Sequence, residues 1–254
     1  MSAASNLPLK LWLAFWRAGQ RYHRYTVVGL EHLNLGRSAL IVGYHGRPFA
    51  FDMCMLTVAI HDRLGYLPHG IVNRSVRHIP PLRWLTDGLA FVTGDDQSLG
   101  AAVRRGEHIV VTPGGPREAA RSFRSNYRVD WGDHLGYLRL ALKHKLPIVP
   151  VAAAGADGTY IGLTDAYALG ERLGLPHDWA WLPWIGLGPL GIFPFSPPFP
   201  VRMHQIVGEP IDPLARGAID PGNHAALRRL HERVTQRVQT LLDQALAERR
   251  GDAS

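Results

Sequence analysis

The sequence predicts a single α/β domain whose mostly parallel or mixed sheet is flanked by helices. Short apolar runs with the length and composition of buried strands occupy residues 38–42, 108–112 and 146–152. Longer amphipathic stretches with helical periodicity occupy residues 52–63, 133–145 and 223–249. Alternation of strands with helices is typical of α/β sheets.

The size of the chain fits one such domain. Its 254 residues are 46% hydrophobic and 19% charged, as in a folded globular protein. We expect a helix within residues 1–25 and the α/β domain over residues 26–250. The single cysteine, Cys54, cannot form an internal disulfide, which indicates a reducing compartment. Because it lies in an apolar run, we expect it to be a buried small side chain rather than a nucleophile.

The first predicted element is an amphipathic helix over residues 7–25. Its apolar side chains, among them Trp12 and Trp16, crowd on part of the circumference, and Lys and Arg side chains supply the polar side. This pattern is typical of a helix that lies in a membrane interface. A terminal helix that docks on its own domain would show the same face, so both interpretations stand.

The remaining elements follow in order. Further strands are predicted at residues 26–29, 70–72, 89–93 and 202–207. Pro80 favours the start of a short helix, and Asp95 or Asp96 can cap a helix that runs to about Arg105. The long amphipathic helix at residues 223–249 closes the fold.

Residues 179–201 form an unusual apolar segment without a charged residue. Its repeated prolines exclude a membrane-spanning helix, and it carries several Trp and Phe side chains. The segment is interpreted as a lipid-facing loop, as a lid over an apolar channel, or as a loop packed on the core.

The formal charge of +7 at pH 7 favours an anionic partner: nucleic acid, a membrane face or a substrate. The positive charge is spread as isolated arginines and short pairs, without zinc-ligand spacing or an RNA-binding aromatic signature. We therefore expect no nucleic acid and no metal. Lys10 and Arg17 interrupt the opening apolar stretch, so we expect neither a signal peptide nor a membrane-spanning helix.

His45 and Asp52 form the first candidate site. His45 follows an apolar strand, where α/β folds place their chemistry, and Asp52 comes within loop reach. A neutral imidazole can take a proton from a hydroxyl group, and a carboxylate can hold the ring in the required tautomer. On its own, this pair is more often a loop contact without a catalytic role.

The second candidate site is the turn that follows the strand at residues 108–112. Backbone amides of Gly114 and Gly115 can approach a phosphate group, and Arg117 can bind it through two hydrogen bonds. Glu118, which follows directly, is a possible supporting residue. A plain turn with a surface arginine is the alternative for this tetrapeptide alone.

Taken in order, these blocks resemble the PlsC-type glycerolipid acyltransferase superfamily, nearest its diacylglycerol acyltransferase-like branch. Residues 44–46 with Asp52 resemble the His-x4-Asp block, and residues 112–119 resemble the Pro-Gly-Gly-x-Arg-Glu form of the phosphate-binding block. Residues 73–81, 88–92 and 147–151 are similar to further blocks of that family. The resemblance extends over roughly residues 25–245.

The resemblance implies acyl transfer from acyl-CoA, or from acyl carrier protein, to a hydroxyl group of a glycerolipid or other lipid. His45 would be the general base, Asp52 would orient it, and Arg117 with Gly114 and Gly115 would bind a substrate phosphate. No cofactor is implied. We also expect peripheral or monotopic attachment to an anionic membrane surface on the cytoplasmic side of the cell membrane.

The sequence departs from the family pattern in two places. Six residues separate His45 from Asp52, where the usual pattern has four, so two extra residues must bulge out. The usual Glu-Gly-Thr-Arg is replaced by Gly-Gly-Pro-Arg, with Glu118 after the arginine. A catalytically inactive protein of the same fold that binds lipid or acyl-CoA is the main alternative.

Overall fold

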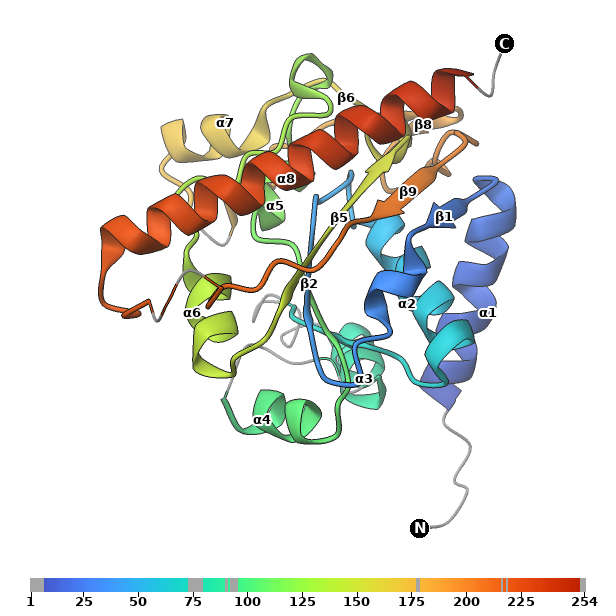
Figure 1. Ribbon diagram of the computed structural model, residues 1–254. Helices are drawn as coiled ribbons and strands as arrows, with labels where there is room; N and C mark the ends of the chain where they lie inside the picture. The colour runs from blue at the N-terminus through green and yellow to red at the C-terminus, as the bar shows by residue number, and fades with distance from the viewer. Residues whose placement is uncertain are drawn as a thin grey trace.

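The computed structural model describes residues 7–72, 80–89, 91, 96–176, 179–215, 217 and 219–251. A six-stranded sheet in the order β1-β9-β5-β2-β4-β3 lies at its centre (Figure 1). Its strands are β1 (Thr26–Val28), β2 (Leu40–Gly43), β3 (His69–Gly70), β4 (Ile109–Val111), β5 (Ile148–Ala154) and β9 (His204–Val207). Neighbouring strands are parallel except β5 and β9, which are antiparallel. The predicted α/β class with a mostly parallel, mixed sheet is confirmed.

Helices cover both faces of this sheet. The α-helices are α1 (Leu7–Tyr22), α2 (Phe51–Leu64), α3 (Pro80–Gly88), α4 (Asp96–Arg104), α5 (Gly115–Ala119), α6 (Gly136–Lys143), α7 (Ala166–Arg172) and α8 (His224–Gly251). A separate three-stranded antiparallel sheet consists of β6 (Ile161–Gly162), β7 (Gly186–Gly188) and β8 (Gly191–Ile192). In Figure 1, α8 crosses the sheet diagonally, and α1 and α2 lie beside each other at the β1 side.

Side chains of β2 alternate between two apolar clusters, as the pleat of a strand requires. Leu40 and Val42 pack in the cluster that contains side chains of α6 and α8. Ile41 packs in the opposite cluster with Met53 and Leu56 of α2. Because both faces are covered, the strand is fully buried and apolar throughout, which is why its sequence shows no polar alternation.

Helix α1 docks on the domain by one side and exposes apolar residues on the other. Leu13 and Trp16 are buried against the α2 side of the fold, and Trp12 donates a hydrogen bond from Nε1 to Thr57 Oγ1 at 2.9 Å. Leu7, Leu11 and Phe15 stay exposed. Their spacing of four residues places them in one row along the helix.

Several elements differ from the sequence prediction. The helix predicted from residue 133 begins at Gly136, and the short helices α5 and α7 and the small sheet were not predicted. Of the strand predicted at residues 89–93, Leu89 and Phe91 lie outside any strand, and the other residues lie outside the described ranges. Asp95 and residues 73–79 also lie outside them.

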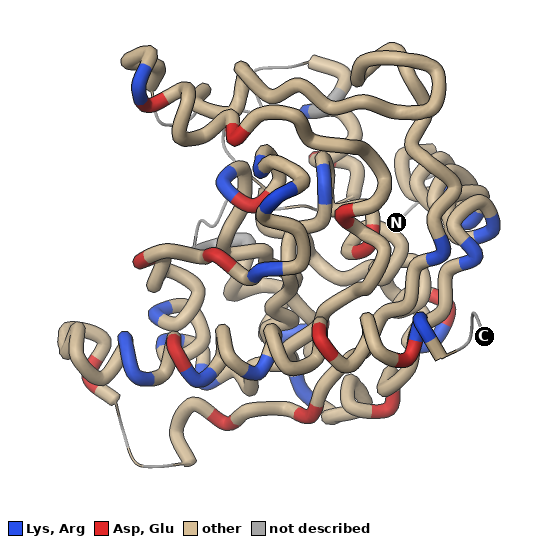
Figure 2. The backbone as a smooth tube through the Cα atoms, turned by 90° about the horizontal axis from the view of Figure 1, so that it is seen from above, with Lys and Arg blue, Asp and Glu red and all other residues tan. Residues whose placement is uncertain are grey.

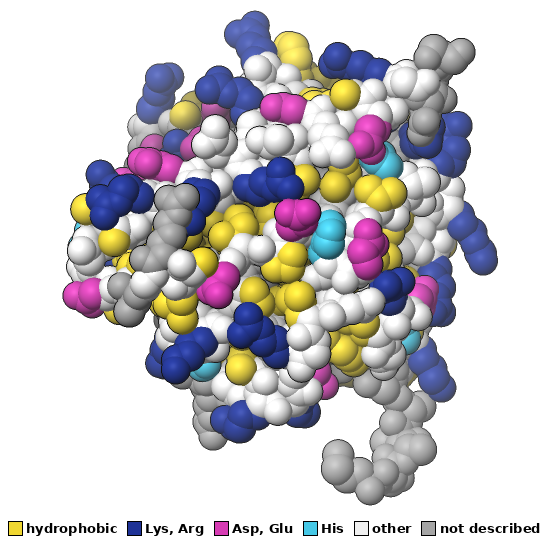
Figure 3. Space-filling view, in the orientation of Figure 1, with side chains coloured by type: hydrophobic (Ala, Val, Ile, Leu, Met, Phe, Trp, Pro, Cys, Tyr) yellow, Lys and Arg dark blue, Asp and Glu magenta, His cyan; other side chains and the backbone are white. Residues whose placement is uncertain are grey.

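Charges are distributed over the whole molecule. Figure 2 shows Lys and Arg on many segments, interspersed with Asp and Glu, and Figure 3 shows Lys and Arg side chains around the rim of one face. This distribution matches the isolated arginines of the sequence. Among the helices of the described residues, none combines the length and the apolar character needed to cross a membrane.

Candidate active site

The two loops singled out by sequence meet at one edge of the sheet. Strands β2 and β4 are parallel neighbours, so the loops that follow them emerge at the same edge. His45 lies just after β2, and α5, with Arg117 and Glu118, lies just after β4.

Two buried side chains hold the backbone of His45. Its N–H donates to Glu118 Oε2 at 3.0 Å, and its carbonyl oxygen accepts from Arg121 Nη2 at 2.9 Å. Glu118 also accepts from the backbone N–H of Asp130 and from Trp131 Nε1, at 2.9 and 3.2 Å. The residue predicted to support the site thus fixes His45 directly.

A hydrogen bond to the main chain fixes the tautomer of the His45 imidazole. Its Nδ1 lies 2.9 Å from the carbonyl oxygen of Gly46, and a carbonyl only accepts, so Nδ1 carries the proton. Nε2 is then the ring nitrogen that can take up a proton. Burial lowers the pKa of His45 to about 4, against a smaller opposing effect of the Gly46 hydrogen bond. The ring is therefore uncharged at neutral pH.

Asp52 lies close to Gly46 in the first turn of α2, and it is fully buried. Neither carboxylate oxygen has a hydrogen-bond partner among the described residues, so no hydrogen bond joins it to His45. Burial raises the pKa of Asp52 to about 7, and the nearby backbone N–H groups of Met53 and Gly46 offset part of this rise. The structure brings the predicted pair to one place without joining their side chains.

A cavity of about 580 Å³ opens beside His45. Most of its walls are apolar side chains from segments far apart in sequence: Trp12, Met53, Phe91, Trp181, Trp184 and Phe193. Part of the segment at residues 179–201 therefore lines the cavity. Other side chains of this segment, such as Leu190 and Phe195, are exposed.

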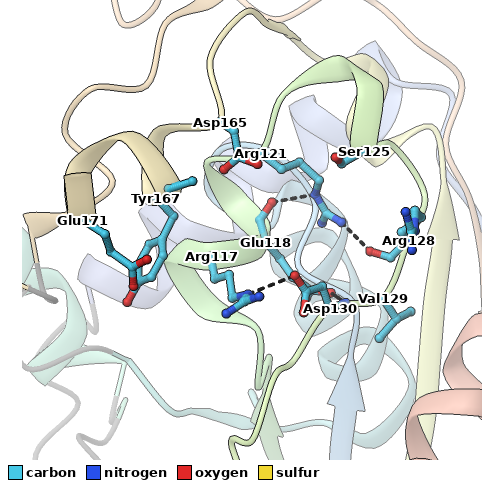
Figure 4. A pocket seen from close by; sticks show the side chains of 11 residues that line it. Arg117, Glu118, Arg121, Ser125, Arg128, Val129, Asp130, Asp165, Tyr167 and Glu171 are labelled. Atoms are coloured by element: carbon cyan, nitrogen blue, oxygen red, sulfur yellow. Dashed lines mark hydrogen bonds and ion pairs between the residues drawn. The ribbon is translucent and has the colours of Figure 1, made fainter. Parts of the chain in front are cut away.

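The residues predicted to bind phosphate, at the start of α5, do not all line the same cavity. Gly115 lines the apolar cavity, whereas Arg117 lines a polar cavity of about 390 Å³ (Figure 4). There, the half-exposed Arg117 donates from Nε to Asp130 at 2.9 Å. A side chain at Gly114 would overlap Glu118, so glycine at this position allows Glu118 to reach His45.

Sequence reasoning did not identify the buried charged side chains that pack near the His45 loop. Arg47 and Asp157 are both buried, and Tyr44 donates from its hydroxyl group to Asp157. Arg121 lies over the ring of Tyr44 at 4.5 Å. Only one signal was present in the sequence: Arg121 follows Glu118 at helical spacing, so the two side chains could act together. In the described part of the chain, no cluster of His, Cys, Asp and Glu is placed to hold a metal ion.

Comparison with known proteins gives one family. Residues 24–154, about half of the chain, match the protein-family model described as Acyltransferase. This range contains both strand-end loops and the residues that hold His45.

Two relatives and one solved structure are similar to most of the chain. An uncharacterized protein of Mycobacterium tuberculosis is 28% identical over 90% of this chain and 63% of that protein. The "DGAT1/2-independent enzyme synthesizing storage lipids" of Homo sapiens is 28% identical over 87% of this chain and 62% of that protein. The chain thus spans less than two thirds of the length of these relatives. The crystal structure of the 1-acyl-sn-glycerophosphate (LPA) acyltransferase PlsC from Thermotoga maritima has the same fold, with a TM-score of 0.56, 17% identity, and coverage of 92% of this chain and 79% of that one.

Proposed function

The chain belongs to the Acyltransferase family, and from this membership we propose that it transfers a fatty acyl group from acyl-CoA, or from acyl carrier protein, to a hydroxyl group of a lipid. One observation carries the proposal. A neutral histidine with Nδ1 protonated lines an apolar cavity large enough for an acyl chain.

His45 acts as the general base in this proposal. As the hydroxyl oxygen of the acceptor attacks the thioester carbonyl, its proton passes to Nε2 of His45. The carbon–sulfur bond of the tetrahedral intermediate then breaks, the ester forms, and the imidazolium returns the proton to the leaving thiolate. The enzyme forms no covalent intermediate, and the step needs no further reactant.

The acyl chain of the donor occupies the apolar cavity. Its aromatic and aliphatic walls favour a hydrocarbon chain by the removal of apolar surface from water. Because His45 lines the same cavity, a chain bound there brings its thioester to the base.

Arg117 binds a phosphate group of the acceptor or the donor, with Gly114 and Gly115 shaping the turn. Support comes from its polar cavity, which is also lined by Glu118 and Arg121, the two side chains that hold the His45 backbone. The ion pair of Arg117 with Asp130 is half-exposed and worth about 0–1 kcal/mol. A phosphate group can replace such a partner and offers bidentate hydrogen bonds to the guanidinium.

The protein works at a membrane surface, as a peripheral or monotopic protein on the cytoplasmic side. Leu7, Leu11 and Phe15 on α1 form an exposed apolar row, and Leu190 and Phe195 add exposed apolar surface in the segment that covers the cavity. The net charge of +7 favours an anionic lipid surface.

A protein that binds acyl-CoA without turnover is the second candidate, and the unpartnered carboxylate of Asp52 favours it. The two functions differ in one assay. Purified protein is incubated with palmitoyl-CoA and a panel of lysophospholipid, monoacylglycerol, diacylglycerol and long-chain alcohol. Thiol release that depends on one acceptor, with the ester detected by mass spectrometry, supports the transferase. Binding of acyl-CoA without release supports the second candidate.

A further inference from the structure

Arg47 lies in the loop between His45 and Asp52, where a charged side chain would be expected to reach solvent. Instead its side chain is completely buried. Burial of a guanidinium is costly unless its donors and its charge are satisfied. The contacts of Arg47 therefore indicate what the loop requires.

The guanidinium of Arg47 joins the loop to two distant segments. Nη1 donates to the carbonyl oxygens of Asp157 and Tyr160 at 3.3 and 3.1 Å. Nη2 donates to the carbonyl oxygen of Ser122 at 3.2 Å and to the side-chain oxygen of Asn126. Only Nε lacks a partner among the described residues. Residues 122–126 follow α5, and residues 157–160 follow β5, so the contacts fix the loop against both.

The carboxylate of Asp157 balances the charge. Its Oδ2 lies 3.9 Å from Arg47 Nη2, and its Oδ1 lies 3.9 Å from Arg121 Nη2. Arg121 is the side chain that holds the carbonyl oxygen of His45. Asp157 thus lies near both buried arginines: Arg47, which anchors the loop, and Arg121, which holds the His45 backbone.

Gly46 lies between His45 and Arg47 in the chain and packs closely against the Asp157 segment. A side chain there would overlap Ala156, next to Asp157, and would come within 2.8 Å of Asp52 Oδ1. The loop therefore fits tightly against the segment that Arg47 binds, and the Gly46 carbonyl oxygen meets both His45 Nδ1 and the N–H of Ala50, each at 2.9 Å. The position of this carbonyl sets the tautomer of His45.

We propose that Arg47, neutralised by Asp157, is a positioning residue that locks the lengthened His45–Asp52 loop and so aims the Gly46 carbonyl at His45. The two extra residues of the loop are then held by a buried anchor of their own. The side-chain contact with Asp52 that the family pattern implies is not needed to select the tautomer. This inference rests on the proposed role of His45 as the base.

The test compares Arg47→Ala with Arg63→Ala, which removes an exposed arginine on α2. Because Arg47 does not line the acyl cavity, its loss lowers kcat by about 100-fold, the cost of a small misplacement of a catalytic group, and leaves KM for palmitoyl-CoA nearly unchanged. Millimolar guanidinium, which can fill the space left by the side chain, restores part of kcat in Arg47→Ala only. Wild-type kcat in Arg47→Ala, or a loss without rescue that also raises KM, overturns the proposal.

A second variant covers the case in which Arg47→Ala does not fold. Asn126→Ala removes one acceptor of Arg47 and keeps the buried Arg47–Asp157 pair, and we expect lower kcat with unchanged donor KM. Unchanged kcat contradicts the proposal. Nitrogen NMR of the imidazole, assigned with His45→Ala, reads the tautomer independently of activity. Nδ1 protonation in wild type and its loss in Arg47→Ala support the proposal, and the same tautomer in both contradicts it. If wild type itself releases no thiol, the proposed function fails, whereas the tautomer measurement still stands.

Discussion

Glu118 Oε2 accepts a hydrogen bond from the backbone N–H of His45 at 3.0 Å. The acidic residue after the Gly-Gly-Pro-Arg turn therefore holds the main chain of the histidine on the neighbouring strand end. Burial raises the pKa of Glu118 to about 8, and the guanidinium of Arg121 opposes this rise. Three N–H groups donate to the two oxygens of Glu118. An ionised carboxylate accepts all three, whereas a neutral carboxyl group carries an O–H on one of its oxygens.

Replacement of this carboxyl group should weaken both stability and activity. Glu118→Gln places an amide group against N–H donors, and we expect a loss of about 1–3 kcal/mol in the free energy of unfolding. Because His45 loses its anchor, kcat should fall more than donor KM rises. Urea unfolding and thiol release measure the two effects, with Glu232→Gln, at an exposed position on α8, as control. Wild-type stability and kcat in Glu118→Gln would contradict this role.

The sequence was sufficient to place the two loops but not the charges behind them. The apolar runs of β2 and β4 identify buried strands, and parallel pairing then brings His45 and Glu118 to one edge. Arg47 and Asp157 carry no such local signal, because their burial depends on contacts with distant segments, such as the hydrogen bond from Arg47 to Asp157, 110 residues further along the chain. Helix α5 was missed because it is only five residues long and begins with Gly115 and Pro116. The connection from Glu118 to His45 depends on tertiary packing alone.

The pH dependence of kcat/KM should report the lowered pKa of His45. The folded free enzyme binds this proton more weakly than an ordinary histidine, so the base stays neutral until the pH falls to about 4. By the same linkage, protonation of His45 favours unfolding between pH 6.5 and about 4, and its contribution to stability is intact above pH 6.5. A decline in kcat/KM with a midpoint at pH 6.5 that belongs to His45 would be inconsistent with the lowered pKa of the ring. Asp52→Asn is the control. A change in kcat/KM near pH 7 that is present in wild type and absent in Asp52→Asn belongs to the titration of Asp52.

A larger side chain at Cys54 should shorten the preferred acyl chain. Cys54 lines the apolar cavity on α2, and desolvation raises the pKa of its thiol, which favours the protonated form. We expect Cys54→Phe to lose turnover with palmitoyl-CoA and to keep most turnover with octanoyl-CoA, while Cys54→Ser keeps both. Rates with a series of chain lengths provide the measurement. Equal losses at every length would show that the cavity does not hold the acyl chain.

The exposed row of α1 should carry membrane binding. Replacement of Leu7, Leu11 and Phe15 by Ser removes apolar surface while leaving the buried Leu13 and Trp16 in place. We expect loss of flotation with anionic vesicles and an unchanged unfolding midpoint. Leu173→Ser is the control, because Leu173 is an exposed apolar residue at the end of α7, on the opposite side of the molecule from α1 in Figure 1. Undiminished flotation of the triple variant would rule out this row as the membrane contact.

The most direct test of the account is acceptor-dependent thiol release from palmitoyl-CoA by wild type, His45→Ala and His224→Ala. His224 is an exposed histidine at the start of α8 and controls for the substitution itself. The account predicts that His45→Ala folds, still binds palmitoyl-CoA and loses thiol release almost completely, while His224→Ala equals wild type. Release by His45→Ala at the wild-type rate would contradict the assignment of His45 as the base.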